Sequence, residues 1–190
     1  MRSAIVLSWA LLALRPAWAD DAAAWAALRS ADAVVALMRH TDAPGAGDPP
    51  GWRLDDCATQ RNLSDQGRTD ARAIGARLKA QRIRIAKVIS SPWCRCLDTA
   101  RLMNVGAVLI EPTFANALML SDRRAELTEG ARTLIGRWRG PGVLLVVTHG
   151  ANIQALTGRS PSPGEIVVVT MSADGALQDR GSLVIAPAPR

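Results

Sequence analysis

The stretch Val143-Leu144-Leu145-Val146-Val147-Thr148-His149-Gly150 decides the fold, because it is apolar or β-branched without interruption until it reaches a histidine. An apolar run of this length is typical of a strand that is buried on both faces of a sheet. The segment Ala33-Val34-Val35-Ala36-Leu37-Met38 has the same pattern and leads directly into Arg39 and His40. Two such strands predict a sheet that is covered by helices on both sides.

Shorter apolar runs alternate with helix signals along the rest of the chain. Strands are expected at residues 86–89, 108–110, 166–171 and 183–185. Helices are expected at residues 21–30, 64–81 and 151–156, from Ser91-Pro92 to about residue 103, and from Ser121 or Asp122 onward. This alternation predicts an α/β fold, a three-layer α/β/α sandwich around a mostly parallel central sheet. Residues 42–56 are rich in Gly, Pro and Asp and are predicted to form the one long loop.

The composition limits the class of protein. The chain has 190 residues, of which 48% are hydrophobic and 21% charged, which fits one globular domain. It contains no uninterrupted run of about 18 apolar residues, so no membrane span is expected. The net charge is +6, but the arginines are scattered and only 4% of the residues are aromatic, which disfavours nucleic acid as a partner. With two histidines and three cysteines, neither a metal site nor a disulfide framework is expected, and no cofactor is required.

The N-terminus has the pattern of a secretory signal. Met1-Arg2 is followed by a short apolar run and then by Ala17-Trp18-Ala19, which places small residues where a signal peptidase cleaves. We therefore expect a signal peptide at residues 1–19, cleavage after Ala19, a domain at residues 20–190, and a periplasmic or secreted protein. A buried N-terminal helix is the alternative interpretation.

Both histidines follow the carboxyl end of a predicted buried strand, and ligands of open α/β sheets bind at that edge. Each histidine on its own could be structural, but two of them at one edge, His40 beside Arg39 and His149 beside Gly150, indicate a functional site. The strand that ends at Ser90-Ser91-Pro92 brings a helix N-terminus and Arg95 to the same edge.

Arg61 and Asn62, which precede the helix at Ser64, add a fourth element to this edge. Guanidinium groups match the oxygens of a phosphoryl group, so a phosphorylated compound is the expected ligand. A neutral imidazole could then act as the nucleophile, and a second, protonated imidazole could neutralise charge on the transferred phosphoryl group.

Four motifs in this order resemble the histidine phosphatase superfamily, whose fold is that of the phosphoglycerate mutases. They are Leu37-Met38-Arg39-His40-Thr41, Leu63-Ser64-Asp65-Gln66-Gly67-Arg68, the segment from Ser90 to Ala100 and Val147-Thr148-His149-Gly150. The resemblance implies that His40 is the phosphorylated nucleophile and that Arg39, Arg95 and His149 form the phosphate pocket.

The signal peptide and the segment from Cys57 to Ser64 resemble a periplasmic branch of this superfamily. That branch includes phosphatases of heptose phosphates in the lipopolysaccharide core, which implies a phosphorylated small molecule or glycan as substrate.

The chain departs from the family pattern at two places. Thr41 stands where the family has glycine, and Asn116 stands where the family has a carboxylate that donates a proton to the leaving group. The nearby acids that could replace it are Asp42, which we favour, and Glu111 and Asp122. A missing acid matters less for phosphohistidine, whose leaving group is already good.

Three functions therefore compete: a phosphomonoester phosphatase, a phosphohistidine phosphatase, and a catalytically weak protein that binds a phosphorylated glycan. A mutase is less favoured because the chain is short, and the sequence carries no signal for the oligomeric state.

The three cysteines have different expected roles. Cys57 lies just before the Arg61 segment and Cys94 lies in the first turn of the Arg95 helix, so the two could form a disulfide in an oxidising compartment. The alternative is three free thiols. Cys96 shares a helix face with Ala100 and Met103 and is expected in the core.

Overall fold

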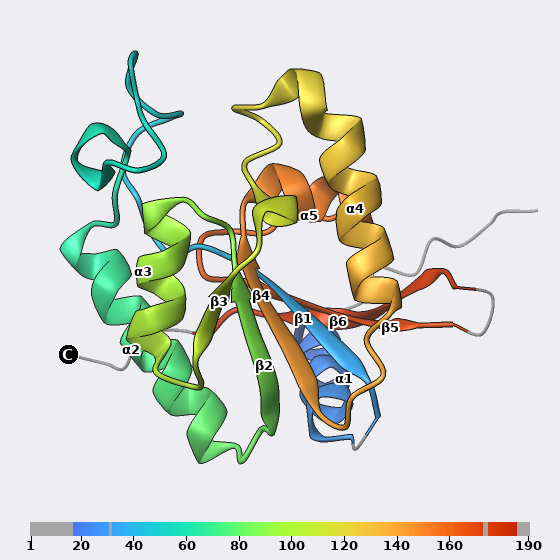
Figure 1. The fold of residues 1–190 in the computed structure, drawn as a ribbon. Coiled ribbons are helices and arrows are strands. Elements are labelled where there is room, and N and C mark those ends of the chain that lie inside the picture. Colours follow the sequence, from blue (N-terminus) through green and yellow to red (C-terminus); the bar gives the residue numbers. More distant parts are fainter. Residues whose placement is uncertain (1–16, 31, 173–174, 186–190) are drawn as a thin grey trace, which may run out of the picture.

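The computed structural model describes residues 17–30, 32–172 and 175–185 (Figure 1). Its centre is a sheet of six strands in the order β3-β2-β4-β1-β5-β6. The strands are β1 (Val34–Arg39), β2 (Ile85–Ser90), β3 (Val108–Ile110), β4 (Val143–Thr148), β5 (Ile166–Met171) and β6 (Leu177–Leu183). Strand β4 is parallel to both β1 and β2, and β2 is parallel to β3, whereas β5 is antiparallel to both β1 and β6.

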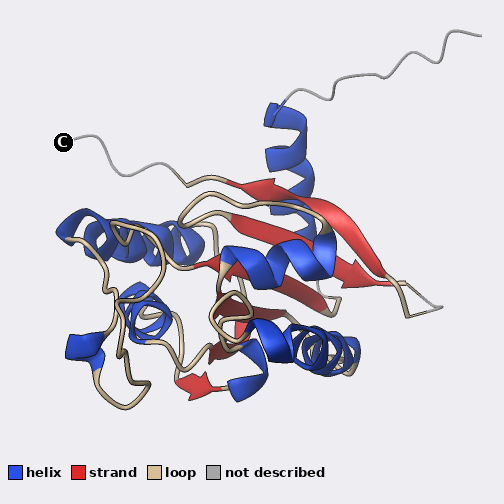
Figure 2. Ribbon diagram, turned by 90° about the horizontal axis from the view of Figure 1, so that it is seen from above, coloured by secondary structure: helices blue, strands red, loops and turns tan. Residues whose placement is uncertain are grey.

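Helices cover both faces of this sheet (Figure 2). They are α1 (Ala17–Arg29), α2 (Asp65–Ala80), α3 (Cys94–Met103), α4 (Arg124–Gly136) and α5 (Gly150–Thr157), together with the short 3₁₀ turns η1 (Cys57–Thr59), η2 (Pro112–Phe114) and η3 (Ser121–Arg123). Buried residues of α1, α2 and α3 share one core cluster, and those of α4 and α5 share the other, except that Leu127 in the first turn of α4 belongs to the first cluster. The predicted three-layer α/β/α sandwich is confirmed.

Strand β4 shows why the sheet forms in the middle of the molecule. All six of its residues are buried. Successive side chains of a strand point to opposite faces, so Val143, Leu145 and Val147 enter the core under α1, α2 and α3, while Leu144 and Val146 enter the core under α4 and α5. A strand without a polar face is stable only in such a position.

Helix α1 begins at Ala17 rather than at residue 21, and α4 begins at Arg124 because Ser121–Arg123 form the 3₁₀ turn η3. Two other predicted boundaries are wrong for a clear physical reason. The last strand is Leu177–Leu183 rather than residues 183–185, because an edge strand with a largely exposed, polar sequence lacks an apolar run. Helix α3 begins at Cys94 rather than at Ser91-Pro92, because the backbone N–H of Ser91 still donates to the Val147 carbonyl at 2.9 Å, as a residue of a strand would.

The start of α2 is as predicted. The Ser64 hydroxyl accepts a hydrogen bond from the backbone N–H of Gly67 at 2.9 Å. Gly67 lies directly against the chain that leaves β1, since a Cβ atom there would come within 2.1 Å of the Asp42 carbonyl oxygen. This contact fixes α2 beside the end of β1.

The predicted signal peptide lies largely outside the described residues. Within the described part of the chain, no helix has both the length and the apolar character that a membrane crossing needs.

Candidate active site

The two histidines meet above the central strands. Strands β1 and β4 are neighbours with Arg39 opposite Thr148, so the residues that follow them, His40 and His149, lie side by side. Their ring centroids are 5.6 Å apart at an interplanar angle of 71°. Each residue is only 3% exposed. The two histidines therefore lie close together, as their positions after the two strands predicted.

His40 is held as a neutral imidazole. Its Nδ1 lies 2.8 Å from the Thr41 carbonyl oxygen, which can only accept, so Nδ1 carries the hydrogen and the lone pair is on Nε2. Burial lowers the pKa of His40 to about 3; the Thr41 hydrogen bond opposes this, and the charges of Arg95, Arg61 and Arg39 add to it. Nε2 is therefore unprotonated at neutral pH.

Three guanidinium groups surround this imidazole, and each is anchored through its terminal nitrogens. Arg39 donates from Nη1 to the Pro161 carbonyl at 2.9 Å, Arg61 donates from Nη1 to the Ala43 carbonyl, and Arg95 donates from both Nη atoms to a carboxylate. The Nε atoms of all three are buried and have no hydrogen-bond partner in the described structure. Buried N–H groups are rarely left unpaired, so three of them beside one histidine indicate an anion site.

Asp48 is the functional residue that sequence reasoning missed. Its Oδ1 accepts from Arg95 Nη1 at 2.7 Å and from the Arg61 backbone N–H at 3.0 Å. Its Oδ2 accepts from Arg95 Nη2 at 3.2 Å and from the Trp93 indole N–H at 3.0 Å. Burial raises the pKa of this carboxyl, but these hydrogen bonds outweigh burial and hold the pKa below its ordinary value. Asp48 is thus the counterion that fixes Arg95 and leaves the Nε–H group of that arginine available.

The surroundings of His149 favour its neutral form. Burial lowers its pKa well below the ordinary value, and Arg95, His40 and the other arginines lower it further. Its Nε2 lies 2.9 Å from the Ser91 hydroxyl and 3.6 Å from the Cys96 sulfur. Trp93 contacts it edge-on, with ring centroids 5.6 Å apart.

Thr41 takes the place of the expected glycine without strain, because its φ is not positive. Its hydroxyl lies 3.1 Å from the Thr99 hydroxyl, and its backbone N–H donates to the same oxygen at 3.2 Å. The side chain is 1% exposed. Thr41 thus ties the end of β1 to α3, the helix that carries Arg95.

None of the three candidate acids contacts a histidine or one of the three arginines in the described structure. Asp42 accepts from the Ser64 hydroxyl at 2.5 Å and so belongs to the N-terminus of α2. Glu111 accepts from both the backbone N–H and the hydroxyl of Thr113, at 3.1 and 2.7 Å, and caps η2. Asp122 is exposed on η3.

Asn116 is 5% exposed, at the place where the family pattern has an acid. Its Oδ1 accepts from the Leu118 backbone N–H at 3.0 Å, which leaves the Nδ2 amine as its donor group. The neighbouring Ala115 carbonyl and Ala117 N–H are both held by Asn152 of α5, at 2.8 and 3.2 Å. Asn116 offers a hydrogen bond to a ligand but no proton.

Asn62 holds its own loop through hydrogen bonds, and Gly150 leaves room for the side chain of Arg39. Asn62 donates from Nδ2 to the carbonyls of Cys57 and Gln60, at 2.6 and 3.1 Å, while its Oδ1 is buried without a partner in the described structure. Gly150 opens α5, and a Cβ atom there would come within 3.4 Å of Arg39 Cδ. The missing side chain gives Arg39 room beside His149.

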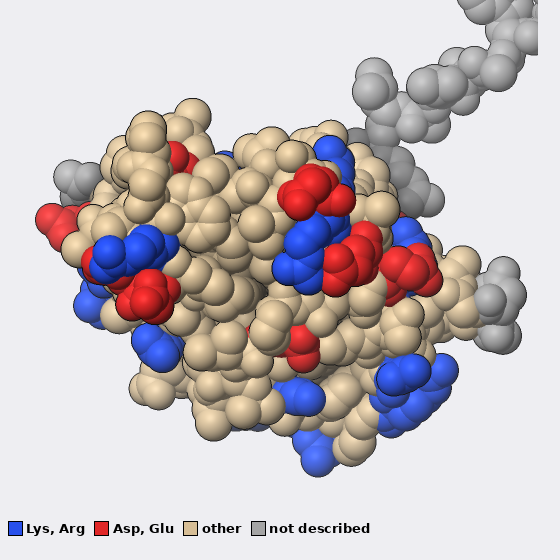
Figure 3. All heavy atoms as spheres, turned by 45° about the horizontal axis from the view of Figure 1, so that its top comes forward, with Lys and Arg blue, Asp and Glu red and all other residues tan. Residues whose placement is uncertain are grey.

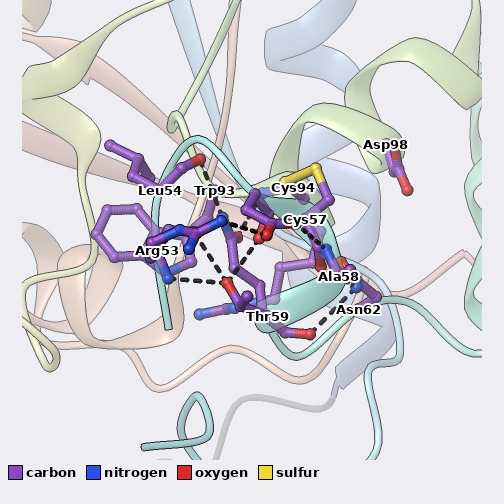
Figure 4. The surroundings of a disulfide bond; sticks show 12 residues. Arg53, Leu54, Cys57, Ala58, Thr59, Asn62, Trp93, Cys94 and Asp98 are labelled. Atoms are coloured by element: carbon purple, nitrogen blue, oxygen red, sulfur yellow. Dashed lines mark hydrogen bonds and ion pairs between the residues drawn. A yellow bond between two sulfur atoms is a disulfide. The ribbon is translucent and has the colours of Figure 1, made fainter. Parts of the chain in front are cut away.

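A disulfide joins Cys57 of η1 to Cys94, the first residue of α3, with Cα atoms 5.7 Å apart. Figure 4 shows this bond between the two elements, with Trp93 and Leu54 to one side. It ties the loop at residues 42–56 to the helix that carries Arg95. Cys96 is a buried free thiol, and burial raises its pKa to about 12.

No group of three or more His, Cys, Asp or Glu side chains that could hold a metal ion occurs among the residues that the structure describes.

Comparisons with known proteins agree with this geometry. The family model of the histidine phosphatase superfamily (branch 1) matches residues 35–119, a range that contains His40, Arg61 and Arg95. Over this part of the chain the sequence is similar to the histidine phosphatase superfamily. The family match and the phosphatase structures that share the fold support a phosphatase enzyme.

Solved structures share this fold. The protein histidine phosphatase SixA, complexed with tungstate, is 21% identical; the alignment covers 79% of this chain and 96% of SixA, with a TM-score of 0.51. A mycobacterial glucosyl-3-phosphoglycerate phosphatase, complexed with VO₃, is 16% identical; the alignment covers 78% of this chain and 97% of that one, with a TM-score of 0.59. No curated protein matches the sequence.

Proposed function

We propose that this histidine phosphatase hydrolyses phosphomonoesters through a phosphohistidine on Nε2 of His40. The observation that carries the proposal is the set of three buried, unpartnered Nε–H groups of Arg39, Arg61 and Arg95 around a neutral imidazole. The tungstate of SixA and the VO₃ of the mycobacterial phosphatase are oxoanions, which supports an oxoanion pocket of the same kind here.

The geometry supports a two-step reaction. The guanidinium groups hold the phosphoryl oxygens, the Nε2 lone pair of His40 forms the N–P bond, and the P–O bond to the leaving group breaks. The Thr41 carbonyl keeps the proton on Nδ1 and orients the ring. Water then attacks phosphorus, the N–P bond breaks, and inorganic phosphate leaves. The negative charge of the phosphoryl group raises the pKa of His149 and favours a protonated ring at that stage.

The leaving oxygen takes its proton from water, because none of the three candidate acids contacts the pocket in the described structure, and the Asp48 carboxylate already accepts hydrogen bonds from Arg95 and Trp93. Asn116 donates a hydrogen bond to that oxygen. General acid catalysis is typically worth 10²–10⁴-fold, so substrates with good leaving groups are favoured.

The test is phosphate release by the purified enzyme from para-nitrophenyl phosphate. His40→Ala should abolish turnover, and Arg39→Ala and Arg95→Ala should each lower kcat/KM by roughly 10²-fold or more. Arg180→Ala is the matched control, since this exposed arginine lies on the edge strand β6 and donates to the Thr170 hydroxyl. Turnover that survives in His40→Ala would contradict the proposal.

Export is the second part of the proposal. The pattern of residues 1–19 is that of a secretory signal, and a disulfide such as Cys57–Cys94 persists in an oxidising compartment. The resemblance to the periplasmic lipopolysaccharide-core phosphatases makes sugar and glycan phosphates the first substrates to examine. Mass spectrometry of the exported protein should find Asp20 at the N-terminus; a chain that keeps Met1 in the cytoplasm would contradict export.

Phosphohistidine hydrolysis is the second candidate, and the Asn116 position favours it. An imidazole leaves without the help of an acid, and SixA, which shares the fold, is a protein histidine phosphatase. A kcat/KM higher for a phosphohistidine peptide than for any sugar phosphate would favour this function over the first.

A further inference from the structure

A cleft of about 380 Å³ opens beside the catalytic centre. Its walls come from the loop at residues 42–56, from the segment between β2 and α3, and from the segments before α4, and they are mainly apolar. The lining includes Trp52, Leu54, Pro92, Trp93, Ala115 and Leu120. Leu54 is 43% exposed there, although large apolar side chains are usually covered.

Trp93 connects this cleft to the catalytic centre. It lines the cleft, while its ring lies edge-on to His149, with 5.6 Å between the ring centroids. Its indole N–H donates to Asp48, the carboxylate that holds Arg95. Trp52, which is partly exposed, stacks at a tilt on Trp93 with centroids 5.1 Å apart. One aromatic layer therefore lies between the cleft and the histidines.

Among the described residues that line the cleft, the charged ones form an ion pair with each other. Arg123 and Glu126 at its edge neutralise each other through two hydrogen bonds, of 2.9 and 2.7 Å. Figure 3 looks toward the side of the molecule where β2 and β4 end; much of the visible face is uncharged, and acidic and basic atoms lie next to each other in mixed groups. A charged group bound here would lose its hydration without gaining a partner.

We infer that this cleft binds the leaving group of the phosphomonoester and selects an uncharged group with the apolar face of a ring. The inference rests on the proposed function: once the phosphoryl group is held by the three arginines, the rest of the substrate has to extend past Trp93. Aromatic side chains stack on the flat faces of aryl rings and on the C–H faces of sugar rings. The Cys57–Cys94 disulfide holds the loop that supplies Trp52 and Leu54.

The experiment compares phosphate release from benzyl phosphate and ethyl phosphate, whose leaving alcohols have closely similar pKa values. A difference in kcat/KM then reports the ring rather than the chemistry. We expect benzyl phosphate to be preferred by roughly tenfold or more, the factor expected for one well-packed ring. 4-Carboxybenzyl phosphate should lose this preference. Glucose 6-phosphate distinguishes a sugar ring from an aromatic ring as the natural occupant of the cleft. A kcat/KM above that of ethyl phosphate assigns the cleft to a sugar, and a kcat/KM at or below it assigns the cleft to an aromatic group.

Two variants test whether the cleft produces the preference. Trp52→Ala and Leu54→Ala should both lower the benzyl-to-ethyl ratio of kcat/KM, and Leu54→Ala is the variant less able to disturb folding. Leu109→Ala on β3 is the matched control, because Leu109 is similarly exposed, at 52%, but does not line the cleft. A wild-type ratio near one, or a ratio that survives both substitutions, overturns the inference. Phosphate release from none of these substrates would instead contradict the proposed function itself.

Discussion

Asp48→Asn is the substitution that most directly probes how the phosphate pocket is held together. The side chains of Asp48 and Arg95 are both 0% exposed and share two hydrogen bonds, of 2.7 and 3.2 Å. Asparagine keeps the shape but removes the charge, and its Nδ2 amine would face donors of Arg95 or Trp93. Removing one partner of a buried ion pair typically costs about 3–5 kcal/mol, because the other charge stays buried and uncompensated.

Urea unfolding at pH 7 measures this loss, with Asp55→Asn as the control. Asp55 lies in the same loop but is 88% exposed and meets Arg53 only at 3.7 Å, so its replacement should change the free energy of unfolding by less than about 1 kcal/mol. Inorganic phosphate should stabilise Asp48→Asn more than the wild type, because the anion supplies the charge that Arg95 has lost. A loss no larger than that of Asp55→Asn, with no additional effect of phosphate, would refute the role of Asp48 as counterion.

Three further predictions follow from the same contacts. The disulfide closes a loop of 37 residues, so its reduction should lower the free energy of unfolding by up to about 4 kcal/mol in the chain-entropy model. Reductant should have no effect on the stability of the control variant Cys57→Ser/Cys94→Ser. Equal stability of the wild type with and without reductant would contradict this prediction. The pKa of His40 is lowered to about 3 in the folded state, so its neutral ring stabilises the folded protein fully above pH 6.5, and this stabilisation is lost as the pH falls from about 6.5 to 3. His40→Gln should therefore flatten the pH dependence of the free energy of unfolding in this range. An unchanged slope would argue against a buried neutral His40. Since the three candidate acids do not contact the pocket in the described structure, and the Asp48 carboxylate is held by Arg95, log kcat/KM should fall steeply as the pKa of the leaving group rises. The slope should be the same in the acid variants; a shallow wild-type slope that steepens in one variant would identify the missing donor (Asp42→Asn, Glu111→Gln, Asp122→Asn).

The strands in the middle of the sheet were predictable because burial on both faces leaves only apolar side chains. Strand β4 was predicted with its observed bounds for this reason. Strand β6 was not, because an edge strand is held by its pairing with β5 and needs no apolar run. The direction of β5 was also hidden, since apolar content does not distinguish parallel from antiparallel neighbours.

The site was predictable where the sheet itself positions the residue. His40 and His149 directly follow adjacent strands, so knowledge of the strand ends was enough to bring them together. Asp48 comes from a long loop whose path depends on tertiary contacts, and no local pattern marks it. The available signal was the charge balance: several arginines expected in one buried pocket require a counterion. Asp42 is near His40 in sequence, but the hydroxyl of Ser64 holds its carboxylate at the start of α2.

The most direct test of the account is to locate the phosphoryl group on the enzyme during turnover. The protein is mixed with para-nitrophenyl phosphate, stopped with base within the first turnover, and digested for mass spectrometry under conditions that preserve phosphohistidine. We predict an acid-labile, base-stable phosphate on the peptide that contains His40, linked through Nε2, and none in His40→Ala. A phosphate on His149, or full turnover without any phosphoenzyme, would contradict the account.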